Sequence, residues 1–144
     1  MKLRKMTQDD LSFLLSVRNH ESTRKFLKND AVFTLEECQE WFSNLEHEWF
    51  IIEVEDAPVG YIRTADNEEV GLDIHMDYRN RGYAKMAYQI FLENKERARL
   101  WVFDDNFAKK LYENLGFRYT GIEERIRGRK YIEMIYEKIP SVYW

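Results

Sequence analysis

The stretch YRNRGYAKM surrounds Gly82 with three cationic side chains, those of Arg79, Arg81 and Lys85, where a helical pattern begins. The first turn of a helix offers unpaired backbone N–H groups and the positive end of the helix dipole. A glycine lets an anionic group approach that backbone closely. The stretch therefore predicts an anion-binding loop suited to a phosphate. A solvated basic helix start is the alternative, and the stretch matches neither the P-loop nor the three-glycine dinucleotide pattern.

Strands and helices are expected to alternate around this loop in the order β-α-α-β-β-β-α-β-α-β-β. Thr7 with Asp10 and Thr34 with Glu37 are typical of helix starts, and Gly116 is typical of a helix end. Hairpins and one βαβ crossover together predict an α/β (α+β) fold in which a sheet packs against helices. The expected strands are 2–6, 49–55, 60–65, 70–76, 98–103, 117–126 and 130–139, and the expected helices follow Thr7, Thr34, Gly82 and Asp105.

Composition narrows the class of protein. The chain has 144 residues, which fits one domain (1–144), and its net charge of −4 argues against nucleic-acid binding while permitting a cationic substrate. A single cysteine, Cys38, allows no intramolecular disulfide. No apolar run approaches the roughly 18 residues of a membrane span, and MKLRKMTQDD lacks the core of a signal peptide. We expect a cytoplasmic protein with no membrane partner and no metal; its oligomeric state is open, a homodimer included.

Two motifs give the chain a family resemblance. Arg79-Asn80-Arg81-Gly82-Tyr83-Ala84 resembles the Arg/Gln-x-x-Gly-x-Gly/Ala motif of the GNAT superfamily of acyl-CoA-dependent N-acyltransferases. The later stretch NFAKKLYENLGF (106–117) resembles that family's Asn-, Tyr- and Gly-Phe-containing segment, in the same order and spacing. The likeness extends over residues 1–139. It implies a mixed, mostly antiparallel sheet of six to seven strands, about four flanking helices, and a splayed strand pair that holds the cofactor.

The resemblance implies that acetyl-CoA is the cosubstrate. Its pyrophosphate would lie on the N–H groups of residues 80–85, and its pantetheine arm would pair with the strand edge from Leu72 to Met76, as in strand addition to a sheet. Asn106 would bind the same arm; an ordinary helix-start residue is the alternative for it. The implied cofactor-binding residues are Ile74, Met76, Arg79, Asn80, Arg81, Gly82, Tyr83, Ala84, Lys85 and Asn106.

Tyr112 is the implied general acid. Attack of an amine on a thioester expels a thiolate, and a phenol close to the sulfur can protonate it. A backbone N–H near Ile74 would hold the oxyanion of the intermediate. The alternative for Tyr112 is a core aromatic residue on an amphipathic helix.

The general base is left open by the sequence. Some family members carry a glutamate on the strand before the last helix, where this chain has Trp101. Glu69 acting through a water molecule ranks first, followed by Asp73 and then His75, and for each an exposed strand or turn residue is the alternative.

The acceptor side carries no motif that names its substrate. Arg18 and Asn19 resemble an Arg-Asn pair in ribosomal-protein and aminosugar N-acetyltransferases and are candidates for a wall of the site. Trp41, Phe42 and Trp49 are expected in the core, and the hairpin tip 127–130 is expected to flank the acceptor cleft. The predicted partner is a small-molecule or peptide amine. A non-catalytic acyl-CoA-binding or regulatory module is the alternative function.

Overall fold

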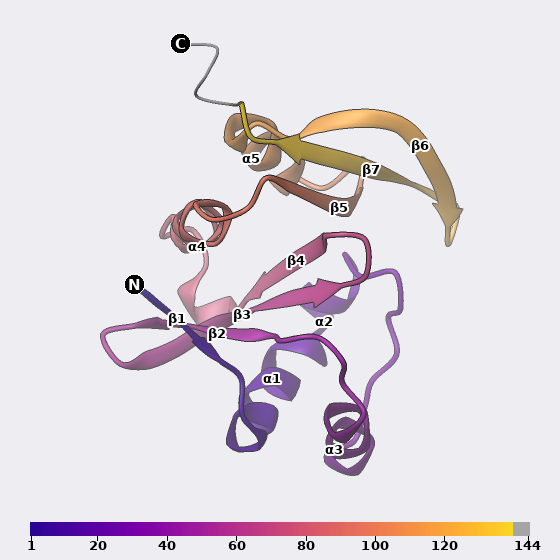
Figure 1. Cartoon of the computed structure of the whole chain (residues 1–144). Coiled ribbons are helices and arrows are strands. Elements are labelled where there is room, and N and C mark those ends of the chain that lie inside the picture. The colour runs from indigo at the N-terminus through magenta and orange to yellow at the C-terminus, as the bar shows by residue number, and fades with distance from the viewer. Residues whose placement is uncertain (140–144) are drawn as a thin grey trace.

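The structure, a computed structural model, describes residues 1–139, whose strands form one seven-stranded sheet in the order β1-β2-β3-β4-β5-β7-β6 (Figure 1). Every neighbouring pair is antiparallel except β4 and β5, which are parallel. The predicted mixed, mostly antiparallel sheet is therefore confirmed. The strands are β1 (Lys2–Lys5), β2 (Phe50–Val54), β3 (Ala57–Ala65), β4 (Glu69–Ile74), β5 (Arg97–Phe103), β6 (Arg118–Ile126) and β7 (Arg129–Glu137).

Five α-helices and two 3-10 turns connect the strands. The α-helices are α1 (Leu11–Arg18), α2 (Glu21–Arg24), α3 (Leu35–Ser43), α4 (Tyr83–Leu92) and α5 (Ala108–Leu115), and the 3-10 turns are η1 (Gln8–Asp10) and η2 (Met76–Tyr78). The sequence did not predict α2, because four residues are too few to show a helical period. The helix α4, expected after Gly82, begins at Tyr83 and ends at Leu92.

The sheet buries both of its faces, because successive strand residues point to opposite sides. On one face Ile51 and its cross-strand partner Tyr61 pack beneath α1 and α3. On the other, Ile52 joins a larger core that includes Tyr88 of α4 and Phe117. Trp41, Phe42 and Trp49 pack against the first of these cores, as predicted.

The helix signals of the sequence mostly hold. Thr34 and Glu37 form the predicted capping box, with hydrogen bonds of 3.0 and 3.1 Å. The Asp10 carboxylate accepts from the N–H of Thr7 at 2.8 Å, although this pair caps η1, which leads into α1. Gly116 ends α5 with a φ of +103°, as a left-handed C-cap.

The expected boundaries of the turn between β2 and β3 are wrong. The turn after β2 consists of Glu55 and Asp56 alone, both with positive φ, which is the backbone of a two-residue hairpin turn. The strand β3 therefore begins at Ala57 rather than 60. Pro58 is accommodated because β3 extends here beyond the last β4 partner, which pairs at Gly60.

Candidate active site

The loop before α4 brings the chain into the helix through a left-handed glycine. Gly82 is the N-cap of α4 with a φ of +80°, and no side-chain hydrogen bond caps the helix there. Asn80 also has a positive φ, +63°, which asparagine tolerates better than most residues. A Cβ built at Gly82 meets no atom within 4 Å. The first N–H groups of α4 therefore remain available to an anion, as the sequence predicts.

The three cations of this loop have different surroundings. Arg79 is held by three hydrogen bonds: Nε donates to the Ile74 carbonyl at 3.0 Å, Nη1 to Ser22 Oγ at 2.7 Å and Nη2 to Thr23 Oγ1 at 2.8 Å. Arg79 thus ties the end of β4 to α2. Its predicted contact with pyrophosphate stays a prediction, and its main structural contribution is to fix the loop.

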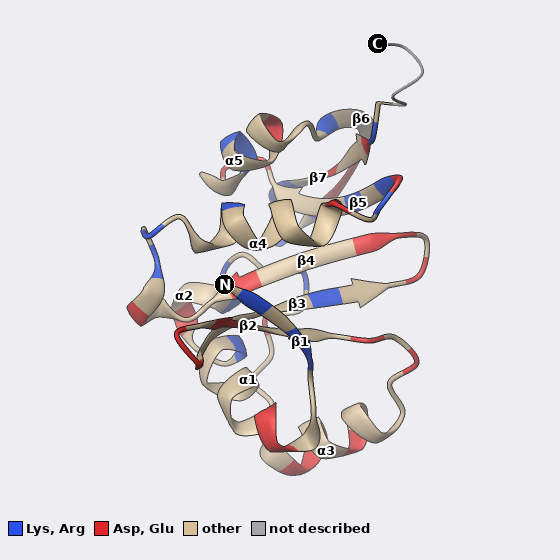
Figure 2. Ribbon diagram, turned by 60° about the vertical axis from the view of Figure 1, so that its left-hand side comes forward, with Lys and Arg blue, Asp and Glu red and all other residues tan. Residues whose placement is uncertain are grey.

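Arg81 and Lys85 are exposed on either side of Gly82. The Arg81 guanidinium lies 5.5 Å from the centre of the Tyr78 ring and donates to the Asp77 carbonyl. Figure 2 shows Lys and Arg positions, in blue, in the loop that leads into α4 and in its first turn. Their predicted contact with a phosphate stays a prediction. The adjacent Tyr83 and Ala84 pack partly into the core.

The strands β4 and β5 separate along their length. Glu69 pairs with Arg99, and this is the one β4–β5 pair in the described part of the chain, whereas β3 stays paired with β4 as far as Ile74. The edge of β4 that faces β5 therefore leaves backbone groups free to pair with an extended ligand. The predicted splayed pair is present. A cavity of about 390 Å³ lies at the opening.

This cavity, called the cofactor cavity below, brings together many of the predicted site residues. Its walls come from the end of β4, the loop before α4, and the first turns of α4 and α5. The predicted residues that line it are Ile74, Arg79, Asn80, Ala84, Asn106 and Tyr112. The others from the α4 start, Arg81, Gly82, Tyr83 and Lys85, adjoin it without lining it.

Met76 is not in β4, contrary to the prediction. The strand ends at Ile74, and His75 begins the 3-10 turn η2 by accepting a hydrogen bond on Nδ1 from the N–H of Asp77 at 3.1 Å. His75 also stacks on Phe13, with ring centres 6.0 Å apart. It lines neither the cofactor cavity nor the cleft that contains Glu69, so its geometry favours a turn-forming role.

Tyr112 lines the cofactor cavity from α5 and contacts two aromatic rings of the core. Its ring meets Tyr88 edge-on at 5.6 Å and Phe117 at 6.1 Å. Burial raises the pKa of the Tyr112 phenol, and the nearby Tyr88 hydroxyl partly offsets that rise. The phenol therefore carries its proton at neutral pH, as a general acid must.

The sequence did not indicate that Tyr88 lines the cofactor cavity. It lines the same cavity from α4, is 1% exposed, and its hydroxyl makes no hydrogen bond within residues 1–139. Its place in the apolar pattern of α4 predicts only a core residue.

The start of α5 departs from the prediction at one residue. Asp105 does not cap the helix; its carboxylate binds Arg129 at 2.8 and 3.1 Å. Asn106 performs the capping, since its Oδ1 accepts from the N–H of Ala108 at 2.9 Å, and it lines the cofactor cavity as well. Phe107 beside it is 95% exposed at the cavity wall.

A second cleft of about 320 Å³, called the acceptor cleft below, shares Arg63 and Trp101 with the cofactor cavity. Glu69, the first-ranked base, lines this cleft but not the cofactor cavity. Trp101 stacks on Tyr131, with ring centres 5.4 Å apart. Burial raises the pKa of Tyr131 to about 12. The two spaces thus meet at the opening between β4 and β5.

Arg63 connects the two spaces and was not singled out from the sequence. Its Nε lies 3.1 Å from Oδ2 of Asp73, the second-ranked base. Its guanidinium crosses Gly71, where a Cβ would lie 2.4 Å from an Arg63 nitrogen. A larger residue at 71 would displace it. The sequence clue that could have identified Arg63 is its position two residues after Tyr61, which places a charged side chain on the same strand face as a buried tyrosine.

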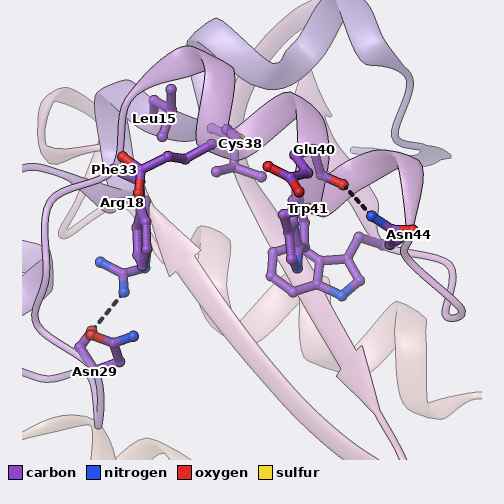
Figure 3. A pocket seen from close by; sticks show the side chains of 11 residues that line it. Leu15, Arg18, Asn29, Phe33, Cys38, Glu40, Trp41 and Asn44 are labelled. Carbon is purple, nitrogen blue, oxygen red and sulfur yellow. Dashed lines mark hydrogen bonds between the residues drawn. The ribbon is translucent and has the colours of Figure 1, made fainter.

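A third cavity, of about 560 Å³, lies between α1 and α3 and shares Arg18, Asn29 and Trp49 with the acceptor cleft. Figure 3 shows Arg18 alongside Phe33, with its guanidinium directed at Asn29. Trp41 lines this cavity too. Arg18 therefore stands at a wall between two spaces, where the sequence left it as a candidate.

Asn19 has a structural task. Its amide donates to the Phe33 carbonyl at 2.8 Å and accepts from the Phe33 N–H at 3.0 Å. The tip of the β6–β7 hairpin, residues 127–130, was predicted to flank the acceptor side, and it binds the loop between α2 and α3. Arg127 donates to the carbonyls of Leu27 and Lys28 at 2.7 and 2.8 Å.

An open sheet edge and an uncapped helix start on one cavity suit an extended ligand that carries phosphates. The family model described as an acetyltransferase (GNAT) domain matches residues 8–138. The chain belongs to the GNAT acetyltransferase family. A comparison with curated proteins found no significant match.

Solved structures share the fold at low identity. Spermidine N-acetyltransferase from Vibrio cholerae, in complex with CoA and spermine, has a TM-score of 0.84 at 19% identity, with 94% of each chain covered. Ribosomal-protein-alanine N-acetyltransferase from Brucella melitensis has a TM-score of 0.77 at 18% identity, with 96% of this chain and 100% of that one covered. An aminoglycoside acetyltransferase in complex with coenzyme A has 0.75 at 19%, with 95% and 93% covered.

Residues 1–139 contain neither a metal-binding cluster nor a membrane-spanning helix. No group of three or more His, Cys, Asp or Glu side chains is arranged to hold a metal ion. None of the described helices is long and apolar enough to cross a membrane.

Proposed function

We propose that the protein transfers an acetyl group from acetyl-CoA to a primary amine by direct attack. The observation that carries this proposal is the meeting, on one cavity, of the unpaired edge of β4, the uncapped start of α4 and the Tyr112 phenol. Acetyl-CoA would supply the thioester, its pyrophosphate on the N–H groups of residues 80–85 and its pantetheine arm along β4. Family membership and the CoA-bound structural neighbours support this assignment.

The chain's own groups would act on three atoms. The amine nitrogen attacks the thioester carbonyl carbon, and a backbone N–H near Ile74 stabilises the resulting oxyanion. The C–S bond breaks as Tyr112 gives its proton to the sulfur, and the proton that the nitrogen loses as the amide forms restores the phenol. The amine arrives as an ammonium ion and must first lose a proton. Glu69 is the one carboxylate lining the acceptor cleft within residues 1–139, and it would take that proton through water.

Release of free thiol from acetyl-CoA, followed with a panel of amines, tests the proposal. The panel includes peptides with free N-termini, polyamines, aminosugars, aminoglycosides and amino acids. Thiol release that depends on both acetyl-CoA and an amine, with the N-acetyl product seen by mass spectrometry, is expected. Tight coenzyme A binding without turnover across the panel would contradict catalysis and favour the alternative, a non-catalytic acyl-CoA-binding module. That alternative is motivated by Trp101, which stands on β5 where some family members carry a glutamate.

A further inference from the structure

Cationic side chains outnumber anionic ones in the acceptor cleft. Arg18, Lys28 and Arg63 line it, against the single carboxylate of Glu69 within the described residues. Two of the cations have counter-ions: Lys28 lies 3.3 Å from Glu124 and Arg63 lies 3.1 Å from Asp73. Within residues 1–139, Arg18 has no carboxylate within ion-pair distance. Once these pairs are counted, two charges of the cleft have no ion-pair partner within the described residues: the carboxylate of Glu69 and the guanidinium of Arg18.

The surroundings of Arg18 make that charge unusual. It is half-buried at the end of α1, its guanidinium lies 5.1 Å from the centre of the Phe33 ring, and Nη1 and Nη2 donate to the carbonyls of Ala31 and Asn29 at 3.1 and 2.6 Å (Figure 3). Burial lowers its pKa. A guanidinium has five N–H groups, so these bonds leave donors unused. Carbonyl partners orient the group without balancing its charge, and partly buried charges are normally paired.

An anion bound at Arg18 would not be part of the cosubstrate. The cofactor cavity, with the exposed Arg81 and Lys85 beside it, is where the phosphates would lie, and Arg18 does not line that cavity. Arg63 and Trp101 stand where the two spaces meet. An anion at Arg18 would therefore arrive with the acceptor.

We infer that the acceptor is a primary amine that also carries a carboxylate or phosphate, and that Arg18 binds this anionic group in the acceptor cleft. The inference rests on the proposed function. Glu69 lines the same cleft and suits the ammonium end of the acceptor, so the unpaired groups of the cleft match a ligand with both charges. The planar fork of arginine fits either anion.

This acceptor class differs from the polyamines and aminoglycosides named for some of the structural neighbours. Spermine and aminoglycosides carry several amines, and a cleft that held such a polycation would place carboxylates around it. Here one unpaired carboxylate stands with one unpaired guanidinium, which suits a ligand with one charge of each sign better than a polycation. The aromatic rings of Trp49, Trp101 and Tyr131 provide the apolar wall of a cleft that is large enough for a small amine.

Matched pairs of amines test the inference. Each pair shares a primary amine and differs in the anion: L-phenylalanine with 2-phenylethylamine, 4-aminobutyrate with butylamine, and phosphoethanolamine with ethanolamine. The ratio of kcat/KM within a pair is measured by thiol release, with spermine as the polycation. We expect the anion-bearing member of at least one pair to be preferred by about tenfold or more. The first two pairs test a carboxylate and the third a phosphate.

Three variants separate anion binding from support of the loop. Arg18→Gln should abolish the preference within the pair, and Arg18→Lys should keep part of it. Arg24→Gln is the matched control, because Arg24 donates to the carbonyls of Asn19 and Asp30 in the same loop but lines neither the acceptor cleft nor the third cavity. It should leave the ratio unchanged, whatever it does to the rate of both members.

Binding of the same pairs to the coenzyme A-saturated protein, measured by calorimetry, makes the test independent of turnover. Tighter, Arg18-dependent binding of an anion-bearing amine without any thiol release would support this inference and contradict the proposed function. Turnover of spermine or of the anion-free amines, with no preference for the anion-bearing members, would overturn the inference and leave the proposed function standing. An Arg18→Gln variant that keeps the wild-type ratio would overturn it as well.

Discussion

The two sides of the site are built from different parts of the chain. On the cofactor side the ligand-facing groups are largely backbone: the open edge of β4 and the N–H groups at the start of α4. On the acceptor side they are side chains from distant elements, with Arg18 from α1, Arg63 from β3 and Trp101 from β5. A backbone site tolerates changes in most of its side chains, whereas a side-chain site changes its ligand with each substitution. The fold therefore fixes the first substrate and leaves the second to be set by individual residues.

Loss of the Tyr112 hydroxyl should have the largest effect. Tyr112→Phe removes the proton donor and keeps the ring contacts with Tyr88 and Phe117, so kcat should fall by about 10²- to 10⁴-fold while the Kd for coenzyme A stays within about twofold. Stopped-flow thiol release and calorimetry measure the two quantities. Tyr136→Phe, a half-buried tyrosine near Phe117 that does not line the cofactor cavity, is the control. An unchanged kcat in Tyr112→Phe would exclude the phenol as general acid.

Gly82→Glu should weaken coenzyme A binding by about 100-fold. The new side chain occupies the open space before α4 and puts a carboxylate where a phosphate is expected. Calorimetry gives the Kd, and circular dichroism checks the fold. Gly121→Glu is the matched control, since Gly121 also has a positive φ, +92°, with nothing within 4 Å of a built Cβ. Equal losses of affinity in both variants would attribute the effect to backbone strain and contradict the cradle.

Asp10→Asn should lower the free energy of unfolding by about 2 kcal/mol and loosen the layer that carries Arg18. The buried Asp10 carboxylate accepts two hydrogen bonds from Arg4, at 2.7 and 2.8 Å, and those bonds are the main cause that lowers its pKa. The stabilisation is therefore present above the ordinary carboxyl pKa and disappears as the pH falls through the lowered value. Urea unfolding between pH 3 and pH 7 measures it.

The neighbouring Asp9→Asn, at an exposed position, is the control for this variant. The loss of stability in Asp10→Asn should shrink as the pH falls below the ordinary carboxyl pKa, because the unfolded wild-type chain takes up a proton on this carboxylate before the folded one does. A difference between wild type and Asp10→Asn that stays constant across the pH range would contradict the account.

Arg81→Gln should have the smallest effect, a loss of coenzyme A affinity of about two- to fivefold. Arg81 is an exposed cation beside the α4 start, and a single exposed charge contributes about 1 kcal/mol or less. The affinity gap between wild type and variant should narrow as salt is raised, because exposed charges are screened. A loss as large as that of Gly82→Glu would contradict the comparison, because side-chain charges rather than backbone N–H groups would then provide most of the affinity.

The contrast between the two sides also explains what the sequence could predict. The positive-φ positions Gly82 and Gly116 could be predicted because glycine is the residue that such positions favour. The strand and helix periods on either side of Gly82 predicted the βαβ crossover. Boundaries were less visible: Met76 has an apolar side chain that fits a strand, but the His75 cap begins a turn first. Asp105 looked like a helix cap because nothing in the sequence shows that Arg129, which comes from another strand, binds it.

The residues of the acceptor side were harder to predict for the same reason. Arg63 meets Asp73 and crosses Gly71 only because β3 and β4 pair in that register. Arg18 could be named from its position, but its unpaired charge depends on which loop carbonyls and aromatic rings surround it. Such contacts join residues far apart in sequence, and no local pattern records them.

The most direct test of the backbone-built cofactor side is a titration of the ¹⁵N-labelled protein with coenzyme A, followed by amide chemical-shift changes. The account predicts the largest changes at the N–H groups of residues 80–85 and along β4 from 72 to 74, with smaller changes around Arg18. Changes concentrated at Arg18, Lys28 and the β6–β7 hairpin, with the start of α4 unaffected, would contradict it.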